Sequence, residues 1–99
     1  MTIPMNHCRW IADPAAGLLW RSWGDAHFAF DPRSGQTHFL NSVAVEVYHQ
    51  LDGEGRSAAD IYRALLERYD IDDDDALQSA IETSLTVLDR LGIVMARPA

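Results

Sequence analysis

The sequence predicts an α+β fold in which the strands come first and the helices follow. Up to about residue 41, bulky apolar and aromatic segments alternate with turns rich in Gly, Asp and Pro, whereas beyond it apolar residues recur with a helical period. Hydrophobic residues make up 47% of the chain, which is too high a share for a disordered one. The length of 99 residues suits one modest core, so we expect residues 1–99 to form a single domain.

Residues 10–41 are expected to form a three-stranded antiparallel meander, after a loosely ordered start at residues 1–9. The strands are, in order, Gly17–Trp23, Ala26–Asp31 and Thr37–Asn41. The pair Gly24-Asp25 fits a two-residue hairpin turn, because Gly tolerates a positive φ. The second turn, residues 31–35, combines an Asp that bonds back to the backbone, a Pro that presets φ and a Gly that accepts the left-handed region.

Three helices are expected over residues 42–92. Asn41 or Ser42 caps the first, which is about ten residues long, and Ser57 opens the second in a pattern that resembles a capping box. The second helix runs to about Tyr69. The residues of these two helices that are expected to be buried are Ala44, Val47, Tyr48, Leu51, Ala58, Ile61, Leu65 and Tyr69.

The third helix is expected to begin within the acidic run at residues 72–75, where the helix dipole favours negative charge, and to end near Gly92. Its inward face is expected to contain Leu77, Ile81, Ser84, Leu85, Leu88 and Leu91. Residues 93–99 then form a C-terminal tail or a short strand. Three strands followed by three helices, with a helix-turn-helix pair at the end, describe a winged-helix-like arrangement.

The formal net charge of −7 arises from 8 Lys and Arg residues against 15 Asp and Glu residues. Proteins that bind nucleic acids without sequence preference are usually net basic, because Lys and Arg neutralise phosphates. A DNA-reading helix places its first turn against the duplex, and here residues 72–75, all Asp, would repel the phosphates. The composition therefore disfavours a nucleic-acid partner and favours a basic one, such as a cationic peptide segment.

Motifs that carry catalysis or bind cofactors are missing from the sequence. There is no glycine-rich phosphate loop, no CxxC and no HExxH, and the 4 His residues are scattered. Cys8, the only cysteine, is expected to be an ordinary free thiol. No apolar run approaches the roughly 18 residues that cross a bilayer, and the N-terminus has no signal-peptide core. We expect no metal, no cofactor, no catalytic residue, no membrane partner and a cytoplasmic location, so an enzyme is not expected.

The third strand and the third helix each carry an unusual surface. Strand residues 37–41 contain no Lys, no Pro and no formal charge, although a bare edge strand invites pairing with another chain. Beside the inward face of the third helix lies a line of small or β-branched residues: Ala76, Ala80, Thr83 and Val87. This line either packs against a neighbouring element or forms the floor of a shallow groove. If strand and helix lie side by side, an extended peptide can pair with the edge while its side chains enter the groove.

Three segments of the chain resemble the PqqD-like proteins, small peptide chaperones also called leader-peptide recognition domains of ribosomally made, modified peptides. They are FDPRSGQTHFLN, SVAVEVYHQLDG and SAADIYRALLERYDID, and the similarity is clearest over residues 18–92. The Trp-rich segment LLWRSWGDAHFAFDPRSGQTHFLN is similar to a subgroup found beside an HPr-kinase-related protein.

The resemblance implies a winged-helix-like fold in which the leader peptide of a precursor adds as a strand to the third strand and lies along the third helix. The implied peptide-binding residues are Thr37, His38, Phe39, Leu40, Asn41, Ala80, Ser84 and Val87. The resemblance also implies that the modifying enzyme is a separate partner. The acidity of residues 70–75 departs from the family pattern, and it either selects the charge of the ligand or caps the helix.

Two alternatives to peptide capture stay open at the level of the sequence. One is a winged-helix regulator that binds DNA. The other is a homodimer in which the third strand pairs with its own copy, so both a monomer and a homodimer are compatible with the chain. Phe39 and Leu40 point to opposite faces of their strand, so one of them is expected to be core.

Overall fold

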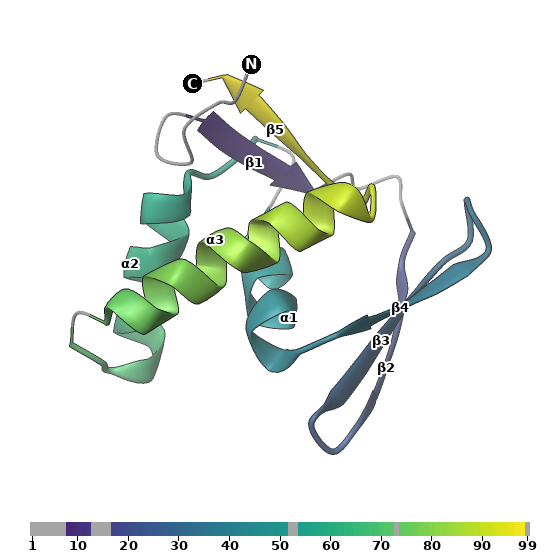
Figure 1. Ribbon diagram of the computed structural model, residues 1–99, viewed down its shortest axis with the longest axis horizontal. Helices are drawn as coiled ribbons and strands as arrows, with labels where there is room; N and C mark the ends of the chain where they lie inside the picture. The colour runs from purple at the N-terminus through teal and green to yellow at the C-terminus, as the bar shows by residue number, and fades with distance from the viewer. Residues whose placement is uncertain (1–7, 13–16, 52–53, 73, 99) are drawn as a thin grey trace.

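The computed structural model describes residues 8–12, 17–51, 54–72 and 74–98, and it has the predicted α+β architecture (Figure 1). Its elements are, in chain order, β1 (Cys8–Ala12), β2 (Leu19–Trp23), β3 (Ala26–Asp31), β4 (Gln36–Leu40), α1 (Ser42–His49), α2 (Ala58–Tyr69), α3 (Asp75–Arg90) and β5 (Val94–Pro98). The strands form two antiparallel sheets, a meander of order β2-β3-β4 and a pair, β1-β5.

The meander agrees with the prediction and differs from it at the strand ends. The first strand begins at Leu19 rather than Gly17, and β4 is shifted one residue toward the N-terminus, so that Asn41 follows it as the N-cap of α1. Gly24 and Gly35 occupy the two turns with φ angles of 57° and 75°, as the turn chemistry requires. In the register of the second hairpin, Phe28 lies opposite Phe39.

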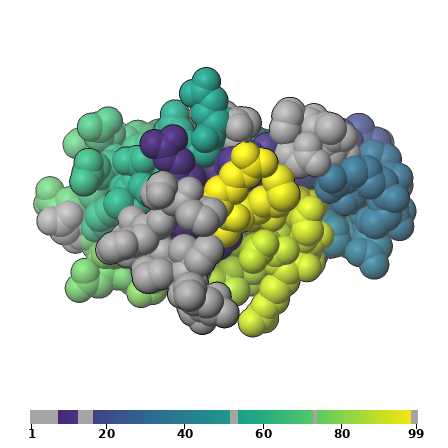
Figure 2. Space-filling view, turned by 90° about the horizontal axis from the view of Figure 1, so that it is seen from above, coloured from purple at the N-terminus to yellow at the C-terminus, as the bar shows by residue number. Residues whose placement is uncertain are grey.

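The two faces of the meander differ sharply in exposure. Ala29 and Leu40 are buried on the inner face, next to α1, at 0% and 2% exposure. Trp23, Phe28 and Phe39 lie on the outer face, where neighbouring rings meet edge to face with centroids 6.1 Å and 5.5 Å apart. The meander forms one end of the molecule, and the helices form the other (Figures 1 and 2). One face of this small sheet is therefore covered, and the other remains open.

The N-terminal strand β1 corrects two expectations. Cys8 and Arg9 belong to a strand rather than to a loosely ordered start, and the meander begins at Leu19 rather than residue 10. Residues 1–7 lie outside the described part of the chain. Trp10 also exchanges backbone hydrogen bonds with Arg56, with N···O distances of 2.7 and 3.0 Å. Because β1 finds its partners at the C-terminus and before α2, the local sequence has no hairpin signal that could predict it.

The end of the chain forms a strand rather than a tail, which decides between the two predicted forms. β5 pairs with β1 along its whole length, with Trp10 opposite Ala96 (Figure 1). Ile93 and Val94, at the start of this segment, are fully buried. Cys8 lies at the opposite end of the β1-β5 pair, and burial raises the pKa of its thiol. The two ends of the described chain thus close the core together.

All three helices begin with side-chain caps. Asn41 accepts a hydrogen bond from the N–H of Ala44 at 2.8 Å, and Ser57 accepts one from the N–H of Asp60 at 3.1 Å. Asp74 accepts bonds from the backbone of the first turn of α3. The acidic run therefore supplies a helix cap. Capping was one of the two roles predicted for this run, the other being selection of the charge of the ligand.

The three helices enclose the predicted core with one clear exception. Every helical residue that is fully buried comes from the predicted set: Ala44, Val47, Ala58, Ile61, Leu65, Ile81, Ser84, Leu85 and Leu88. Tyr69 was predicted to be buried and is instead 52% exposed. It ends α2, and the next residue, Asp70, turns the chain away in the left-handed region. None of the described helices is both long enough and apolar enough to cross a membrane.

We predict that the β1-β5 sheet is essential for stability. Trp10→Ala removes a buried ring, so the free energy of unfolding should fall by about 3–5 kcal/mol. Met95→Ala, on the exposed side of β5, should change it by only about 0.5 kcal/mol. Urea unfolding monitored by circular dichroism measures both changes. Equal effects of the two substitutions would contradict a core role for β1.

Candidate functional site

A groove lies between the end of β4 and the middle of α3. Its volume is about 150 Å³, and its walls are formed by Phe39, Leu40, Asn41, Ala44, Thr83, Ser84 and Val87. Five of the predicted site residues therefore meet there: Phe39, Leu40, Asn41, Ser84 and Val87. Thr37, His38 and Ala80 were predicted with them but do not line the groove. The end of the strand surface that the sequence singled out therefore meets part of the helix surface, at Thr83 and Val87.

Two of the groove residues were not among the predicted site residues. Thr83 belongs to the small-residue line of α3, and its place on the helical wheel was the signal that could have included it. Ala44 lies in the first turn of α1, where its regular spacing identified it only as a core residue. Its contribution to the groove depends on how α1 sits between β4 and α3, which the sequence does not encode locally.

The strand wall of the groove is an open edge. Within the described residues, β4 pairs with β3 on one side and with no strand on the other. Leu40 and His38 point inward at 2% and 8% exposure, whereas Phe39 points outward and is 64% exposed. Leu40 is thus the core member of the Phe39–Leu40 pair. Phe39 is a large apolar side chain at an unpaired edge, where a further strand would cover it.

The helix wall is built from small side chains. Ser84 is buried beneath the groove, while Thr83 and Val87 lie at its surface. The neighbouring line of α3, with Ile81, Leu85 and Leu88, is fully buried in the core. At Thr83 and Val87 the second face of the helix is therefore exposed beside the groove, whereas Ala76 and Ala80 of the same line do not border it.

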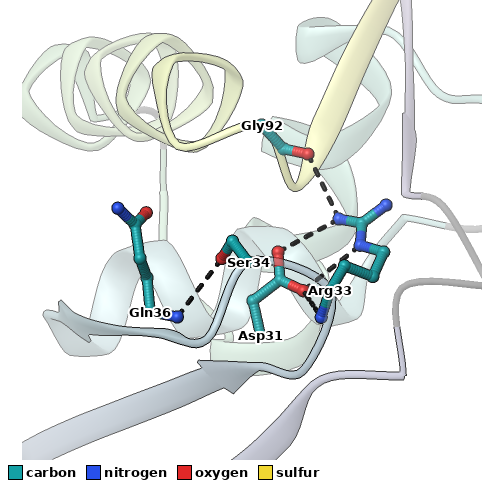
Figure 3. A network of polar contacts seen from close by, with 5 residues as sticks. All are labelled: Asp31, Arg33, Ser34, Gln36 and Gly92. Atoms are coloured by element: carbon teal, nitrogen blue, oxygen red, sulfur yellow. Dashed lines mark hydrogen bonds and ion pairs between the residues drawn. The ribbon is translucent and has the colours of Figure 1, made fainter.

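The turn between β3 and β4 is attached to the end of α3 through Arg33 (Figure 3). The guanidinium of Arg33 donates to both carboxylate oxygens of Asp31 at 3.2 Å and to the carbonyl of Gly92 at 3.4 Å. The backbone N–H of Arg33 adds a further bond to Asp31 at 2.9 Å. These contacts hold one end of β4 near the C-terminus of α3, and the Asn41 cap holds its other end on α1.

The buried carboxylate of Asp31 is kept ionised by these bonds. The hydrogen bond from the Arg33 side chain is the main cause that lowers the pKa of Asp31, and His38 adds a smaller favourable interaction. The Nε2 atom of His38 is buried and has no hydrogen-bond partner among the described residues. The His38 side chain therefore faces the interior, so only its backbone is available at the edge.

A second hollow of about 200 Å³ lies where α1, the end of α2 and the start of α3 meet. Its walls include Val43, Leu65 and Leu77, and Glu46 lies at its border. A hydrogen bond with Glu46 raises the pKa of Tyr69, which also lines the hollow. The sequence had assigned Tyr69 to the core and gave no indication of this hollow.

A third, shallow hollow of about 300 Å³ covers the outer face of the meander. Its lining residues are Leu19, Arg21, Trp23, Phe28, Phe30 and Thr37. Leu19 and Trp23 are 61% and 71% exposed, so this face is largely apolar around Arg21 and Thr37, and the contact between Phe28 and Phe39 extends it to β4. At the second hollow, the hydroxyl of Ser42 lies 3.2 Å from Nε2 of His27, and Nδ1 of the same ring lies 2.8 Å from the hydroxyl of Ser22. No three potential metal ligands cluster in the described parts of the chain.

Comparison with known proteins gives one match. The sequence profile of a family described as "Coenzyme PQQ synthesis protein D (PqqD)" matches residues 26–94. This region extends from the start of β3 to the first residue of β5, and it contains β4, α3 and the groove between them. No curated protein and no solved structure shows a significant match to the chain.

We predict that the Asp31–Arg33 contact contributes stability at neutral pH and loses it in acid. The unfolded chain takes up a proton on Asp31 near about pH 4, whereas the folded protein resists protonation until its lower pKa is reached. Arg33→Leu should therefore destabilise the protein at neutral pH, and the difference from the parent should shrink as the pH falls below about 4.

Urea unfolding midpoints measured between neutral and acid pH test this expectation. Arg21→Leu is the matched control, because Arg21 is exposed on β2. It should shift the midpoint little at any pH. A difference between the parent and Arg33→Leu that stays constant with pH would contradict the assignment.

Proposed function

This chain belongs to the PqqD family, as the match over residues 26–94 shows, and from that premise we propose that it is a non-catalytic peptide chaperone. In this role it captures the leader part of a precursor peptide and presents it to a separate modifying enzyme. The family supports the broad function of peptide binding in the biosynthesis of ribosomally made, modified peptides. The groove beside β4 is the basis for the mode of capture.

The observation that carries the proposal is the open edge of β4 next to the groove of α3. An added strand would hydrogen-bond to the free backbone groups of β4, as in other cases of strand addition. Its side chains would alternate between two surroundings. One set would enter the groove over Ala44 and Ser84, and the other would cover Phe39 on the outer face.

The attachment of β4 at both ends favours this mode. Arg33 ties the strand to the end of α3, and Asn41 ties it to the start of α1. An edge that already has its bound conformation loses less conformational entropy when the ligand arrives. The groove residues are apolar or carry neutral polar groups, so they suit recognition and include no acid or base that would activate the Thr83 or Ser84 hydroxyl. Chemistry on the peptide is therefore left to the partner enzyme.

A homodimer is the second candidate, because the same edge and the apolar outer face could meet their own copies. Peptide binding and dimerisation would then compete for β4. Sedimentation at increasing protein concentration distinguishes the two. For a dimer, the apparent mass should rise with protein concentration and fall again when the peptide is added. The DNA-binding alternative is weaker, because the N-terminus of α3 carries Asp74 as its cap and Asp75 in its first turn.

We predict that Phe39→Lys weakens capture of the precursor peptide. The substitution removes an exposed apolar contact and adds a charge to the edge, so the Kd should rise about tenfold or more. Leu19→Lys is the matched control. Leu19 has a similar exposure, 61% against 64%, but lies on the far strand, so its Kd should change less than about twofold.

Amide chemical shifts of the labelled protein locate the contact in the same experiment. Changes are expected at residues 37–41 and 76–88. Changes confined to other regions, or equal losses of affinity in the two Lys variants, would rule out strand addition at β4.

A further inference from the structure

The hollow between the three helices lies directly beyond the end of the β4 groove. Asn41 and Ala44 line the groove, while their neighbours Ser42 and Val43 line the hollow. On the helix, Leu77 of the hollow precedes Ser84 of the groove by two turns on the same side. The groove and the hollow are therefore adjacent along residues 41–44.

The hollow is apolar inside and incompletely covered. Val43, Leu65 and Leu77 form the interior walls. Tyr69 and Ile71 form the lip and remain 52% and 43% exposed, so two neighbouring apolar side chains stand open at its border. The volume of about 200 Å³ is large enough for one bulky aliphatic or aromatic side chain.

The lip of this hollow is acidic. Asp70 and Asp72 alternate with Tyr69 and Ile71 along the chain and are exposed, and Glu46 borders the opening. Glu46 contacts Arg68, whose Nε lies 3.9 Å from the carboxylate, a long contact for an ion pair. The acidic groups therefore outweigh the basic one at the opening, in a chain whose net charge is already −7.

We propose that this hollow is a second subsite for the same peptide, and that it receives a bulky apolar residue whose sequence neighbour is Arg or Lys. The apolar side chain fills the space between Val43 and Leu77. The neighbouring cation lies at the lip and pairs with Glu46, supported by the field of Asp70 and Asp72. The inference rests on the proposed peptide capture and specifies which peptides are captured.

A phage-displayed library of random peptides tests the subsite even while the natural ligand is unidentified. Peptides selected on the parent protein should share an apolar residue beside Arg or Lys, placed to one side of an extended segment. A synthetic copy of the most enriched peptide then gives a Kd by fluorescence anisotropy. Glu46→Gln, which keeps a polar partner for Tyr69, should weaken binding about three- to tenfold. Ile71→Ser should weaken it by a similar, about threefold or larger, factor.

The control variants separate this subsite from the β4 edge. Asp89→Asn makes the same change of charge at the other end of α3 and should alter the Kd less than about twofold. Circular dichroism confirms that each variant folds before its Kd is used. Added salt should reduce the effect of Glu46→Gln, because the pair at the lip is partly exposed.

The possible results distinguish the subsite in the hollow from peptide capture at β4. The subsite is overturned if the selected peptides lack the basic–apolar pair. It is also overturned if they bind Glu46→Gln and Ile71→Ser as tightly as the parent but fail to bind Phe39→Lys. Either result leaves capture at β4 intact. Peptides that bind Phe39→Lys unchanged overturn capture at β4. Failure to select any peptide overturns both.

Discussion

The burial of one face of α3 is the constraint on which the rest of the structure depends. Ile81, Leu85 and Leu88 are completely buried, and this face packs against α1, α2 and β5 at once. Because the helix cannot rotate without exposing these side chains, its neighbouring line of small residues has a fixed direction, toward β4. The groove is therefore a consequence of core packing. Small side chains at Thr83 and Ser84 leave room there that larger residues would fill.

The unpaired edge of β4 forms the wall of the groove that lies opposite this helix face. A strand with an unpaired edge and an exposed aromatic side chain is usually a liability, and it remains tolerable when another chain is meant to cover it. Here Arg33 and Asn41 hold the two ends of the strand against α3 and α1, so the edge keeps its position beside the groove. The acidic run before α3 caps that helix through Asp74, whereas the acid that lines the hollow is Glu46 of α1.

A chaperone that works by strand addition gains little specificity from the backbone, because every extended peptide can form the same hydrogen bonds. Selection must come from side-chain surroundings at or beyond the edge. Phe39 provides an apolar surface, the groove admits small or slender side chains, and the hollow near Glu46 combines apolar walls with negative charge. Under the proposed function, the helices would discriminate among precursor peptides and β4 would supply general affinity.

The sequence by itself determined the features that depend on neighbours a few residues apart: the meander with its Gly and Pro turns, the caps at Asn41 and Ser57, and the helical periods. It also identified Phe39, Leu40, Asn41, Ser84 and Val87, which do meet in one groove. Only the tertiary structure decided that β1 pairs with β5, that Leu40 faces inward, that Tyr69 lies open, and that Ala44 joins the groove. The reason is that these features depend on contacts between segments distant in the chain, and a local pattern of residues does not specify which remote surface will cover it.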